Sequence, residues 1–305
     1  MKAIQTTGFH KHDVRFPAEG GIEISAWLFV PEGHSAQLPA ITMAHGYAGT
    51  KYHGLERLAE AFASAGFVVL LHDHRNFGDS AGEPRQDINP WQQISDWRRA
   101  ISYLQQRPEV DENRIGLWGT SYAGGHAIVL GATDRRLKAV AAQVPTIDGY
   151  ANGLRRVAPE AVAGLEARFA ADEHAQLRGE PPARQTIVSA DTTRPAAYYA
   201  PDAVDFYLQP VPEGAWENTV TIRSTRWARM YAPGDFVERV SPTPLLMVIA
   251  THDHIAVTDL ALKAYERALE PKRLVTIKGG HFDPYVREFK AASQAAIDWF
   301  QTHLG

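Results

Sequence analysis

The chain has 305 residues, of which 45% are hydrophobic and 22% are charged, and its formal net charge is −4. This composition is ordinary for a globular protein, and the length fits one large α/β domain or two small ones. The slight acidity indicates neither a nucleic-acid partner nor an anionic membrane surface. Because the chain has no cysteine, disulfides, thiolate metal sites and a cysteine nucleophile are excluded.

Residues 1–7 contain no apolar signal core, and no stretch of the chain approaches the length of a membrane span. We therefore expect a cytoplasmic location and no membrane partner. The partner that the sequence predicts is a small-molecule substrate. The oligomeric state is left open between a monomer and a homodimer.

Residues 12–144 alternate between strand-like and helix-like segments. The first two strands, at 12–17 and 21–30, are predicted to form a hairpin. Asn89-Pro90 is typical of a helix N-cap followed by its first position. The other predicted elements are a helix at 52–65 and buried strands at 39–44, 67–71, 114–118 and 137–144. This alternation predicts an α/β fold with a doubly wound, mostly parallel sheet.

Residues 119–125 form a sharp turn between a strand and an apolar helix. The turn carries Ser121 between Gly119 and Ala123, and small residues are needed there because the strained backbone brings neighbouring chain close. A strand, such a turn and a helix form the nucleophile elbow of α/β-hydrolases. Taken alone, the pattern also fits a glycine-rich turn with an ordinary serine.

Residues 145–240 have a different texture, with few strand-like runs and more arginine, alanine and proline. Helices are predicted at 159–178, 202–208 and 216–231. Sheet elements resume afterwards, so we expect an α/β-hydrolase core of residues 1–144 and 241–305 with a helical cap inserted at 145–240.

Three aromatic residues of the predicted 216–231 helix, Trp216, Trp227 and Tyr231, fall near one face. They are our candidates for substrate-binding residues. The alternative is that they only pack the interior of the cap.

The last part of the chain returns to the core pattern. A strand at 244–250, a helix at 257–269 and a strand at 273–277 precede a final helix, which Asp283-Pro284 is predicted to cap. Asp253 follows the first of these strands and His281 follows the second. Because both lie at carboxyl ends of strands, they are expected at the same sheet edge as Ser121.

The order serine, acid, histidine is the one that α/β-hydrolases use. We therefore predict Ser121, Asp253 and His281 as nucleophile, orienting acid and base. Asp259 competes with Asp253, but it falls in the first turn of the next helix, where acids are favoured anyway. Asp283 is set aside because capping explains it.

An oxyanion needs two N–H donors. One is expected from the backbone of Tyr122, which follows the nucleophile, and the other from Tyr47 in the His45-Gly46-Tyr47 loop after an early strand. The runs around Asp73 and Asp253, each flanked by two histidines, also resemble metal ligands. The strands that precede them would not be neighbours in a doubly wound sheet, so we predict no metal and no cofactor.

With these residues placed, the chain resembles an α/β-hydrolase almost from end to end. More narrowly, it resembles the YcjY-like hydrolases and the fungal polyketide transferases and thiohydrolases. The motifs that carry the resemblance are at residues 73–86, Asn89-Pro90-Trp91, the elbow at 119–125, and residues 280–285. The resemblance implies a serine acyl-enzyme with the triad named above, and it covers the segment 145–240 poorly. Asp73 and Arg75 are expected to form a structural charged pair.

The function predicted first is hydrolysis of an ester or thioester of a small to medium acyl group. The alternative is transfer of an acyl group to an alcohol or amine, which members of the resembling group also perform. A third reading is a hydrolase-fold protein that binds a ligand without catalysis. Prolyl peptidase activity is disfavoured because it usually comes with a propeller domain, and the chain is too short to contain one.

Overall fold

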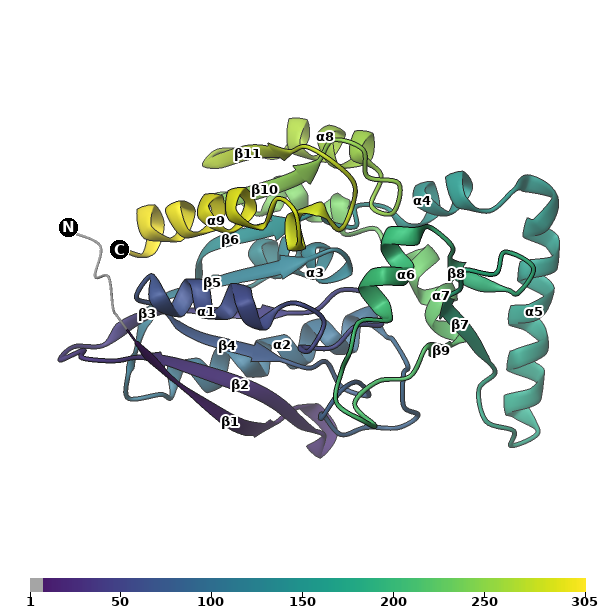
Figure 1. The fold of residues 1–305 in the computed structure, drawn as a ribbon, viewed down its shortest axis with the longest axis horizontal. Helices are drawn as coiled ribbons and strands as arrows, with labels where there is room; N and C mark the ends of the chain where they lie inside the picture. The colour runs from purple at the N-terminus through teal and green to yellow at the C-terminus, as the bar shows by residue number, and fades with distance from the viewer. Residues whose placement is uncertain (1–7) are drawn as a thin grey trace.

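The computed structural model describes residues 8–305, and its centre is an eight-stranded sheet (Figure 1). The strand order is β1-β2-β4-β3-β5-β6-β10-β11, with the β1–β2 and β2–β4 pairs antiparallel and the other pairs parallel. The strands are β1 (Phe9–Pro17), β2 (Glu23–Pro31), β3 (Leu38–Ala44), β4 (Val68–His72), β5 (Val110–Thr120), β6 (Leu137–Gln143), β10 (Leu245–Ala250) and β11 (Lys272–Ile277).

Helices cover both faces of this sheet, as the alternating pattern predicted. Helices α1 (Glu56–Ser64) and α9 (Phe289–Leu304) pack on one face, and α2 (Pro90–Gln105), α3 (Tyr122–Thr133) and α8 (Thr258–Arg267) pack on the other. All side chains of β4 and β10 are buried, which is what a parallel strand covered on both faces requires. The predicted doubly wound, mostly parallel sheet is therefore confirmed.

The predicted N-cap residue of α2 is confirmed. The Asn89 side chain accepts hydrogen bonds from the backbone N–H groups of Trp91 and Gln92, at 3.1 and 3.4 Å, and Pro90 occupies the first turn. Trp97, in the same helix, is fully buried and donates its indole N–H to Thr42 of β3 at 2.9 Å. The cap sets where α2 begins, and this bond fixes the helix against the sheet.

Residues 145–240 lie at the carboxyl ends of the parallel strands (Figure 1). Helices are present as predicted, but the segment also contains a small sheet of order β8-β7-β9, which the sequence did not reveal. The 216–231 helix was also placed too early: the β-branched run Thr219–Thr221 pairs with β7, and the helix begins only at Ile222. The elements are α4 (Gly149–Arg156), α5 (Pro159–Leu177), β7 (Arg184–Val188), β8 (Ala196–Tyr198), α6 (Pro201–Tyr207), β9 (Thr219–Thr221), α7 (Ile222–Met230) and the 3₁₀ helix η2 (Pro233–Arg239).

The division of the chain into a core of residues 1–144 and 241–305 and a cap of residues 145–240 stays a proposal. Residues 1–7 of that core range lie outside the described residues. We call residues 145–240 the cap below.

The final helix also begins later than predicted. Asp283-Pro284 opens a separate 3₁₀ turn, η3 (Asp283–Tyr285), and α9 starts at Phe289. The Asp283 carboxylate does not cap α9, because it accepts the backbone N–H of Gly280 at 2.7 Å. Val286, with φ −122° and ψ −81°, breaks the helical backbone between the two pieces.

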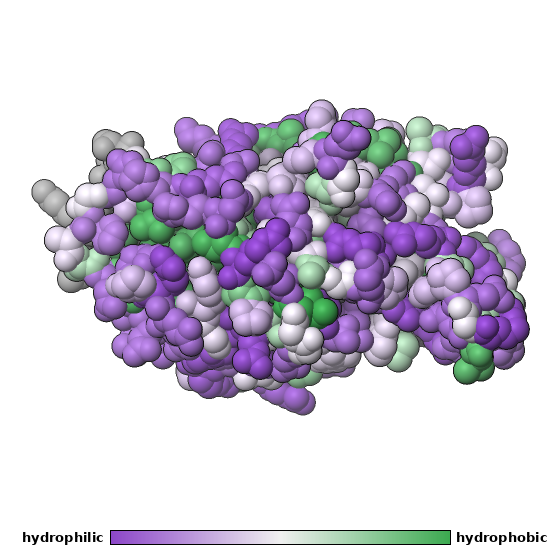
Figure 2. Space-filling view, turned by 90° about the horizontal axis from the view of Figure 1, so that it is seen from below, coloured by the Kyte–Doolittle hydropathy of each residue, from purple (hydrophilic) through white to green (hydrophobic). Residues whose placement is uncertain are grey.

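Hydrophilic side chains predominate in Figure 2, and they separate the groups of hydrophobic ones. None of the helices in residues 8–305 is both long enough and apolar enough to cross a bilayer.

Candidate active site

Ser121 lies at the turn between β5 and α3 in a strained backbone conformation, with φ 56° and ψ −119°. Two glycines make room for this turn. A Cβ added to Gly119 would lie 2.1 Å from the carbonyl oxygen of Ala123, and one added to Gly46 would lie 2.8 Å from the Cβ of Ser121. The turn is therefore held between its own helix and the loop after β3, as the small residues of the motif predicted.

Ser121, His281 and Asp253 form one hydrogen-bonded chain. Nε2 of His281 lies 2.9 Å from the Ser121 hydroxyl, and Nδ1 of His281 lies 2.7 Å from a carboxylate oxygen of Asp253. The carboxylate partner implies that Nδ1 carries the proton, so Nε2 is free to accept the hydroxyl hydrogen. All three residues are buried. The structure thus brings together the three residues that the sequence predicted, from the ends of β5, β10 and β11.

Asp253 is suited to remain ionised. Burial acts to raise the pKa of its carboxyl, but the His281 ring and hydrogen bonds outweigh it and hold the pKa below its ordinary 3.8. Those bonds include the N–H groups of Ile255 and Ala256, which donate to the other carboxylate oxygen at 2.8 Å each. The carboxylate is therefore fixed on one side by the backbone and points at His281 with the other.

The competing acids lie elsewhere. Asp259 is exposed and forms an ion pair with Arg155 of the cap, whose hydrogen bond holds the pKa of Asp259 well below its usual range. Asp283 is engaged with Gly280, one residue before His281. Of the three acids weighed from the sequence, Asp253 alone contacts the histidine, while Asp283 closes the turn that carries it.

The two candidate oxyanion donors belong to two segments that meet at Ser121. Tyr122 begins α3, and Tyr47 follows Gly46, whose backbone approaches the serine closely. Within residues 8–305, neither backbone N–H donates a hydrogen bond to another residue, so both are free to bind a ligand oxygen. The rings of Tyr47 and Tyr122 pack edge to face, with centroids 5.6 Å apart. This packing couples the loop to the elbow.

Two cap residues hold the loop after β3 in place. The Tyr207 hydroxyl donates to the carbonyl of Tyr47 at 2.6 Å, and the indole N–H of Trp216 donates to the carbonyl of Ala48 at 2.7 Å. The cap therefore helps to position the candidate oxyanion donor. The sequence placed Tyr207 in a helix but did not reveal this contact.

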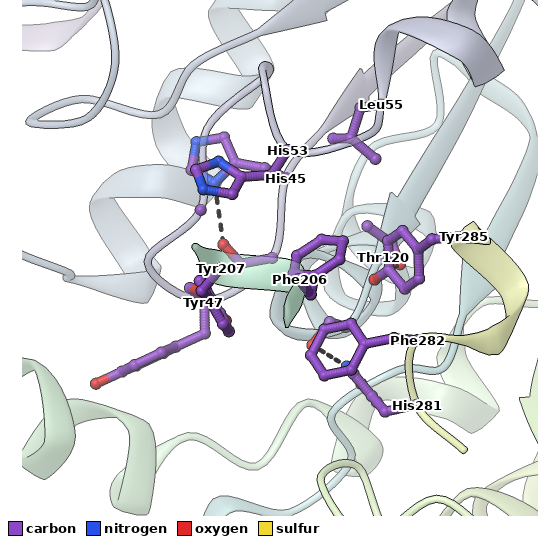
Figure 3. Close-up of a pocket in the computed structure, with 13 residues that line it drawn as sticks. His45, Tyr47, His53, Leu55, Thr120, Phe206, Tyr207, His281, Phe282 and Tyr285 are labelled. Carbon is purple, nitrogen blue, oxygen red and sulfur yellow. Dashed lines mark hydrogen bonds between the residues drawn. The ribbon is translucent and has the colours of Figure 1, made fainter. Parts of the chain in front are cut away.

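A pocket opens at Ser121 between the core and the cap (Figure 3). Phe206 and Tyr207 of α6 line it together with Phe282 and Tyr285, and the rings of Phe206 and Phe282 stack with centroids 4.5 Å apart. The lining consists of phenylalanine and tyrosine rings, histidine rings, two hydroxyl side chains, two glycines and one aliphatic side chain, Leu55. Within the described residues it includes no carboxylate. The full lining is His45, Gly46, Tyr47, Gly49, His53, Leu55, Thr120, Ser121, Phe206, Tyr207, His281, Phe282 and Tyr285.

Known proteins resemble this chain in sequence and in fold. A sequence profile of the X-Pro dipeptidyl-peptidase (S15) family matches residues 20–283. The chain belongs to this family. The crystal structure of the α/β-hydrolase GrgF from Penicillium sp. sh18 superimposes with a TM-score of 0.83 at 27% identity, covering 97% of this chain and 99% of GrgF. The S15-family chain is thus a member of the α/β-hydrolase enzymes.

Three curated relatives match along most of the chain. The quorum-quenching protein AidA of Acinetobacter baumannii is 32% identical over 95% of this chain and 94% of its own length. The polyketide transferase grgF of a Penicillium species is 30% identical over 96% and 97%. The thiohydrolase aneE of Aspergillus aculeatus is 29% identical over 86% and 83%. The resemblance to polyketide transferases and thiohydrolases that the motifs indicated is therefore confirmed.

The predicted substrate-binding residues of this S15-family protein do not line the pocket. Trp216 contacts it only indirectly, through the loop after β3, and Trp227 of α7 is half-buried away from it. Tyr231 is buried behind the elbow, where its hydroxyl lies 2.8 Å from Nδ1 of His126 and its ring packs on Tyr122. This arrangement favours the alternative of packing for Tyr231.

The expected pair of Asp73 and Arg75 was wrong. Arg75 pairs with Asp96 of α2, with two nitrogens at 2.5 Å from its carboxylate oxygens. The Asp73 carboxylate instead accepts the backbone N–H of Lys51 at 2.7 Å and its ammonium at 2.5 Å, and the same ammonium lies 2.6 Å from Asp79. Adjacent charged residues thus face different partners, and the Lys51 contacts tie the loop after β3 to the loop after β4.

Proposed function

We propose that this protein is a serine hydrolase that cleaves an ester or thioester of a small to medium acyl group through an acyl-enzyme on Ser121. The observation that supports this proposal is the unbroken hydrogen-bond chain from Ser121 through His281 to Asp253, beside two unused backbone N–H groups. A serine hydroxyl needs a base and an orienting acid to become nucleophilic, and this chain supplies both.

In the proposed reaction, Nε2 of His281 takes the hydroxyl proton of Ser121 while the oxygen attacks the substrate carbonyl carbon. The N–H groups of Tyr47 and Tyr122 bind the oxyanion of the tetrahedral intermediate. When the intermediate collapses, the proton on His281 passes to the leaving alcohol or thiol. Water then attacks the acyl-enzyme, gives a proton to His281, and releases the acid and the free serine.

The pocket lining supports an uncharged acyl substrate over an X-Pro peptide. A dipeptidyl peptidase must bind the protonated amino terminus of its substrate, for which a carboxylate is the natural partner. Within the described residues, Asp and Glu are absent from the lining of this pocket, while five of its side chains are phenylalanine or tyrosine. Membership of the S15 family sets the fold, and the chemistry of the pocket sets the substrate class.

The proposal is tested by intact-mass analysis after exposure to a fluorophosphonate probe. We expect one adduct per chain, located on Ser121 by peptide mapping, and no adduct on Ser121→Ala. Competition with a panel of acyl esters, acyl thioesters and an Ala-Pro amide then ranks the substrate classes. Labelling of a different serine, or protection by the Ala-Pro amide alone, would overturn the proposed function.

Acyl transfer is the second candidate. The cap covers the sheet edge that carries Ser121, and an acyl-enzyme sheltered from water is what a transferase needs. The relative grgF is named a polyketide transferase. Both reactions share the acyl-enzyme, so they differ only in whether water or another nucleophile attacks it.

A further inference from the structure

A second pocket lies beneath the first, on the face of the sheet that α1 and α9 cover. It is lined by Leu58 of α1, Phe289 and Ser293 of α9, and Trp118 and Gln143 of the sheet. In the present conformation this pocket has a cavity volume of about 10 Å³, room for about one water molecule, so a longer ligand can enter only if its wall moves. Its lining is largely apolar, and neither the proposed reaction nor the sequence motifs assign a role to it.

The two pockets share a common wall. Leu55 and Tyr285 line both of them. The Tyr285 hydroxyl forms a hydrogen bond with the side chain of Thr120, the residue before Ser121. In Figure 3, Tyr285 lies against Thr120 at the side of the first pocket. The ring of Tyr285 therefore separates the candidate nucleophile from the second pocket.

Strand β5 contributes a residue to each of the two pockets. Thr120 lines the first pocket and Trp118 lines the second. Residues two apart on a strand point to the same face, so Trp118 lies about 7 Å deeper along the face that Thr120 occupies. A chain that enters beside Ser121 and follows this face passes the ring of Tyr285 and arrives over Trp118.

Trp118, which lines the second pocket, carries a hydrogen-bond donor without a partner in the described part of the chain. Its side chain is fully buried, and its indole N–H has no hydrogen-bond partner among residues 8–305. A buried N–H without a partner is destabilising, so such groups usually have a role or a ligand. A purely aliphatic chain would leave this donor unpaired, whereas a chain with a keto or hydroxyl oxygen near its end would satisfy it.

We propose that the second pocket is a subsite for the distal part of the acyl chain, reached when the Tyr285 side chain swings away from Thr120. The ligand class is a medium-length acyl group that carries an oxygen acceptor toward its end, bound by Leu55 and Leu58 along its length and by the Trp118 N–H at the oxygen. This subsite rests on the proposed function, because the acyl carbonyl must be held at Ser121.

The first test narrows the pocket from α9. Ser293→Leu places a larger side chain in the second pocket, while Gln294→Leu introduces the same side chain at the next, exposed position of the helix. For Ser293→Leu, the ratio of kcat/KM for an octanoyl thioester to that for an acetyl thioester should fall about tenfold, as expected when a hydrophobic pocket loses methylene-sized space. Gln294→Leu should keep the wild-type ratio. Equal ratios in all three proteins would overturn the subsite.

A second variant acts in the opposite direction and guards against misfolding of the first. Leu58→Ala enlarges the pocket from α1 and should raise the octanoyl-to-acetyl ratio, and its melting temperature reports whether the fold is kept.

The Trp118 donor is tested by comparing an octanoyl thioester with its analogue that carries a ketone near the chain end. Wild type should prefer the ketone about tenfold, the effect of one net hydrogen bond, and Trp118→Phe should abolish the preference. Absence of the preference in wild type would remove the oxygen acceptor from the proposal.

The subsite is also tested without turnover, so that its failure is distinct from failure of the proposed function. A crystal structure of Ser121→Ala with the octanoyl thioester should show the chain between Leu55 and the displaced Tyr285 ring, above Trp118. A chain that lies instead against Phe206 and Tyr207 of the cap would overturn the subsite while leaving the serine hydrolase intact. Absence of fluorophosphonate labelling at Ser121 would instead refute the proposed serine hydrolase, wherever the chain lies in the crystal structure.

Discussion

Ser121 combines a strained backbone with a complete set of partners. A positive φ is costly for a residue with a side chain, and it persists here because Gly46 and Gly119 leave room for it and the backbone N–H of Ser121 bonds to Gln143 at 2.9 Å. The strain directs the hydroxyl toward His281. We infer that the local conformation serves the chemistry.

Replacing the candidate nucleophile should separate activity from folding. Ser121→Ala removes the hydroxyl that bonds to His281 but keeps the turn, so we expect a wild-type melting temperature. Turnover of the best ester should fall by about 10³-fold or more, the residual rate coming from oxyanion binding alone. Steady-state kinetics and circular dichroism on the same preparation measure both. A variant that keeps a tenth of the wild-type turnover would refute the assignment of Ser121.

The two acids after β10 should differ sharply. Asp253→Asn replaces a carboxylate that holds the Nδ1 proton of His281, which favours the wrong tautomer, so turnover should fall by about 10³- to 10⁴-fold. Asp259→Asn, the matched control six residues later, breaks an exposed ion pair with Arg155 and should change turnover by less than about twofold. The measurement is kcat for both variants on one ester. If Asp259→Asn lost more turnover than Asp253→Asn, the orienting acid would be Asp259 of α8.

At the scale of elements, the periodicity of apolar residues and the capping residues predicted those features of the fold that depend on neighbouring residues. The hairpin, the buried strands and the start of α2 at Asn89 follow from alternation and side-chain hydrogen bonds that neighbouring residues make. The elbow was predicted from its small residues, and Asp253 and His281 were predicted from their positions after two strands. Each of these features depends on residues that are close in sequence or on the general rule for strand ends.

What could not be predicted depends on distant partners. Strand β9 exists because Thr219–Thr221 pairs with β7, which lies more than thirty residues earlier. The aromatic wall joins Phe206 of the cap to Phe282 of the core, and no periodicity within either segment indicates that they stack. Lys51 was missed as the partner of Asp73 because their side chains meet only when two loops are folded together.

The loop after β3 gives a prediction at this scale. Tyr207→Phe removes the hydroxyl that bonds to the Tyr47 carbonyl and leaves that carbonyl without this donor, a cost of about 1–3 kcal/mol for a buried group. The loop should loosen, so kcat should fall several-fold and fluorophosphonate labelling should slow. Tyr199→Phe is the control, since that cap hydroxyl bonds only to nearby backbone at Ala196 and Arg194. Equal kinetics in the two variants would mean that Tyr207 does not position the loop.

At the scale of the whole molecule, the candidate site lies where core and cap meet. The cap therefore affects whether water or another nucleophile reaches the acyl-enzyme. If the protein is a hydrolase, an added alcohol or amine should compete with water at about 55 M only in proportion to its own reactivity. If it is a transferase, one acceptor should give saturable product formation and faster total release of acyl groups. We expect hydrolase behaviour with simple acceptors, measured as the ratio of transfer product to free acid. Saturation with a simple alcohol would contradict this.

A cluster of buried histidines makes stability depend on pH. His72 has both ring nitrogens unbonded within the described residues, and its ring lies 5.2 Å from that of His74, which is 4.6 Å from His45 and 5.6 Å from His126. Burial, with smaller contributions from His45 and His126, lowers the pKa of His72 to about 3. The pKa of His126 is also about 3, mainly through burial. These rings are therefore neutral in the folded protein at neutral pH.

The sign of the effect follows from the lowered pKa values. In the unfolded chain a histidine takes up a proton near its ordinary pKa of 6.5, whereas folded His72 does so only near 3. The stability that each neutral ring contributes is complete above pH 6.5 and is lost as the pH falls between those values. The loss approaches about 1.4 kcal/mol per pH unit for each histidine. The free energy of unfolding should therefore decline from about pH 6.5 downward, before most carboxylates titrate.

His72→Leu tests this coupling because it removes one such ring from the core. Relative to wild type, the variant should gain stability as the pH falls, by about 1.4 kcal/mol per pH unit between about pH 6 and pH 4. Urea unfolding at a series of pH values measures the difference directly. Above about pH 7.5 the ring is neutral in both states, so the difference between the two proteins should be constant there whatever the packing cost of the substitution. Curves that stay parallel down to pH 4 would mean that His72 is not a source of the acid sensitivity.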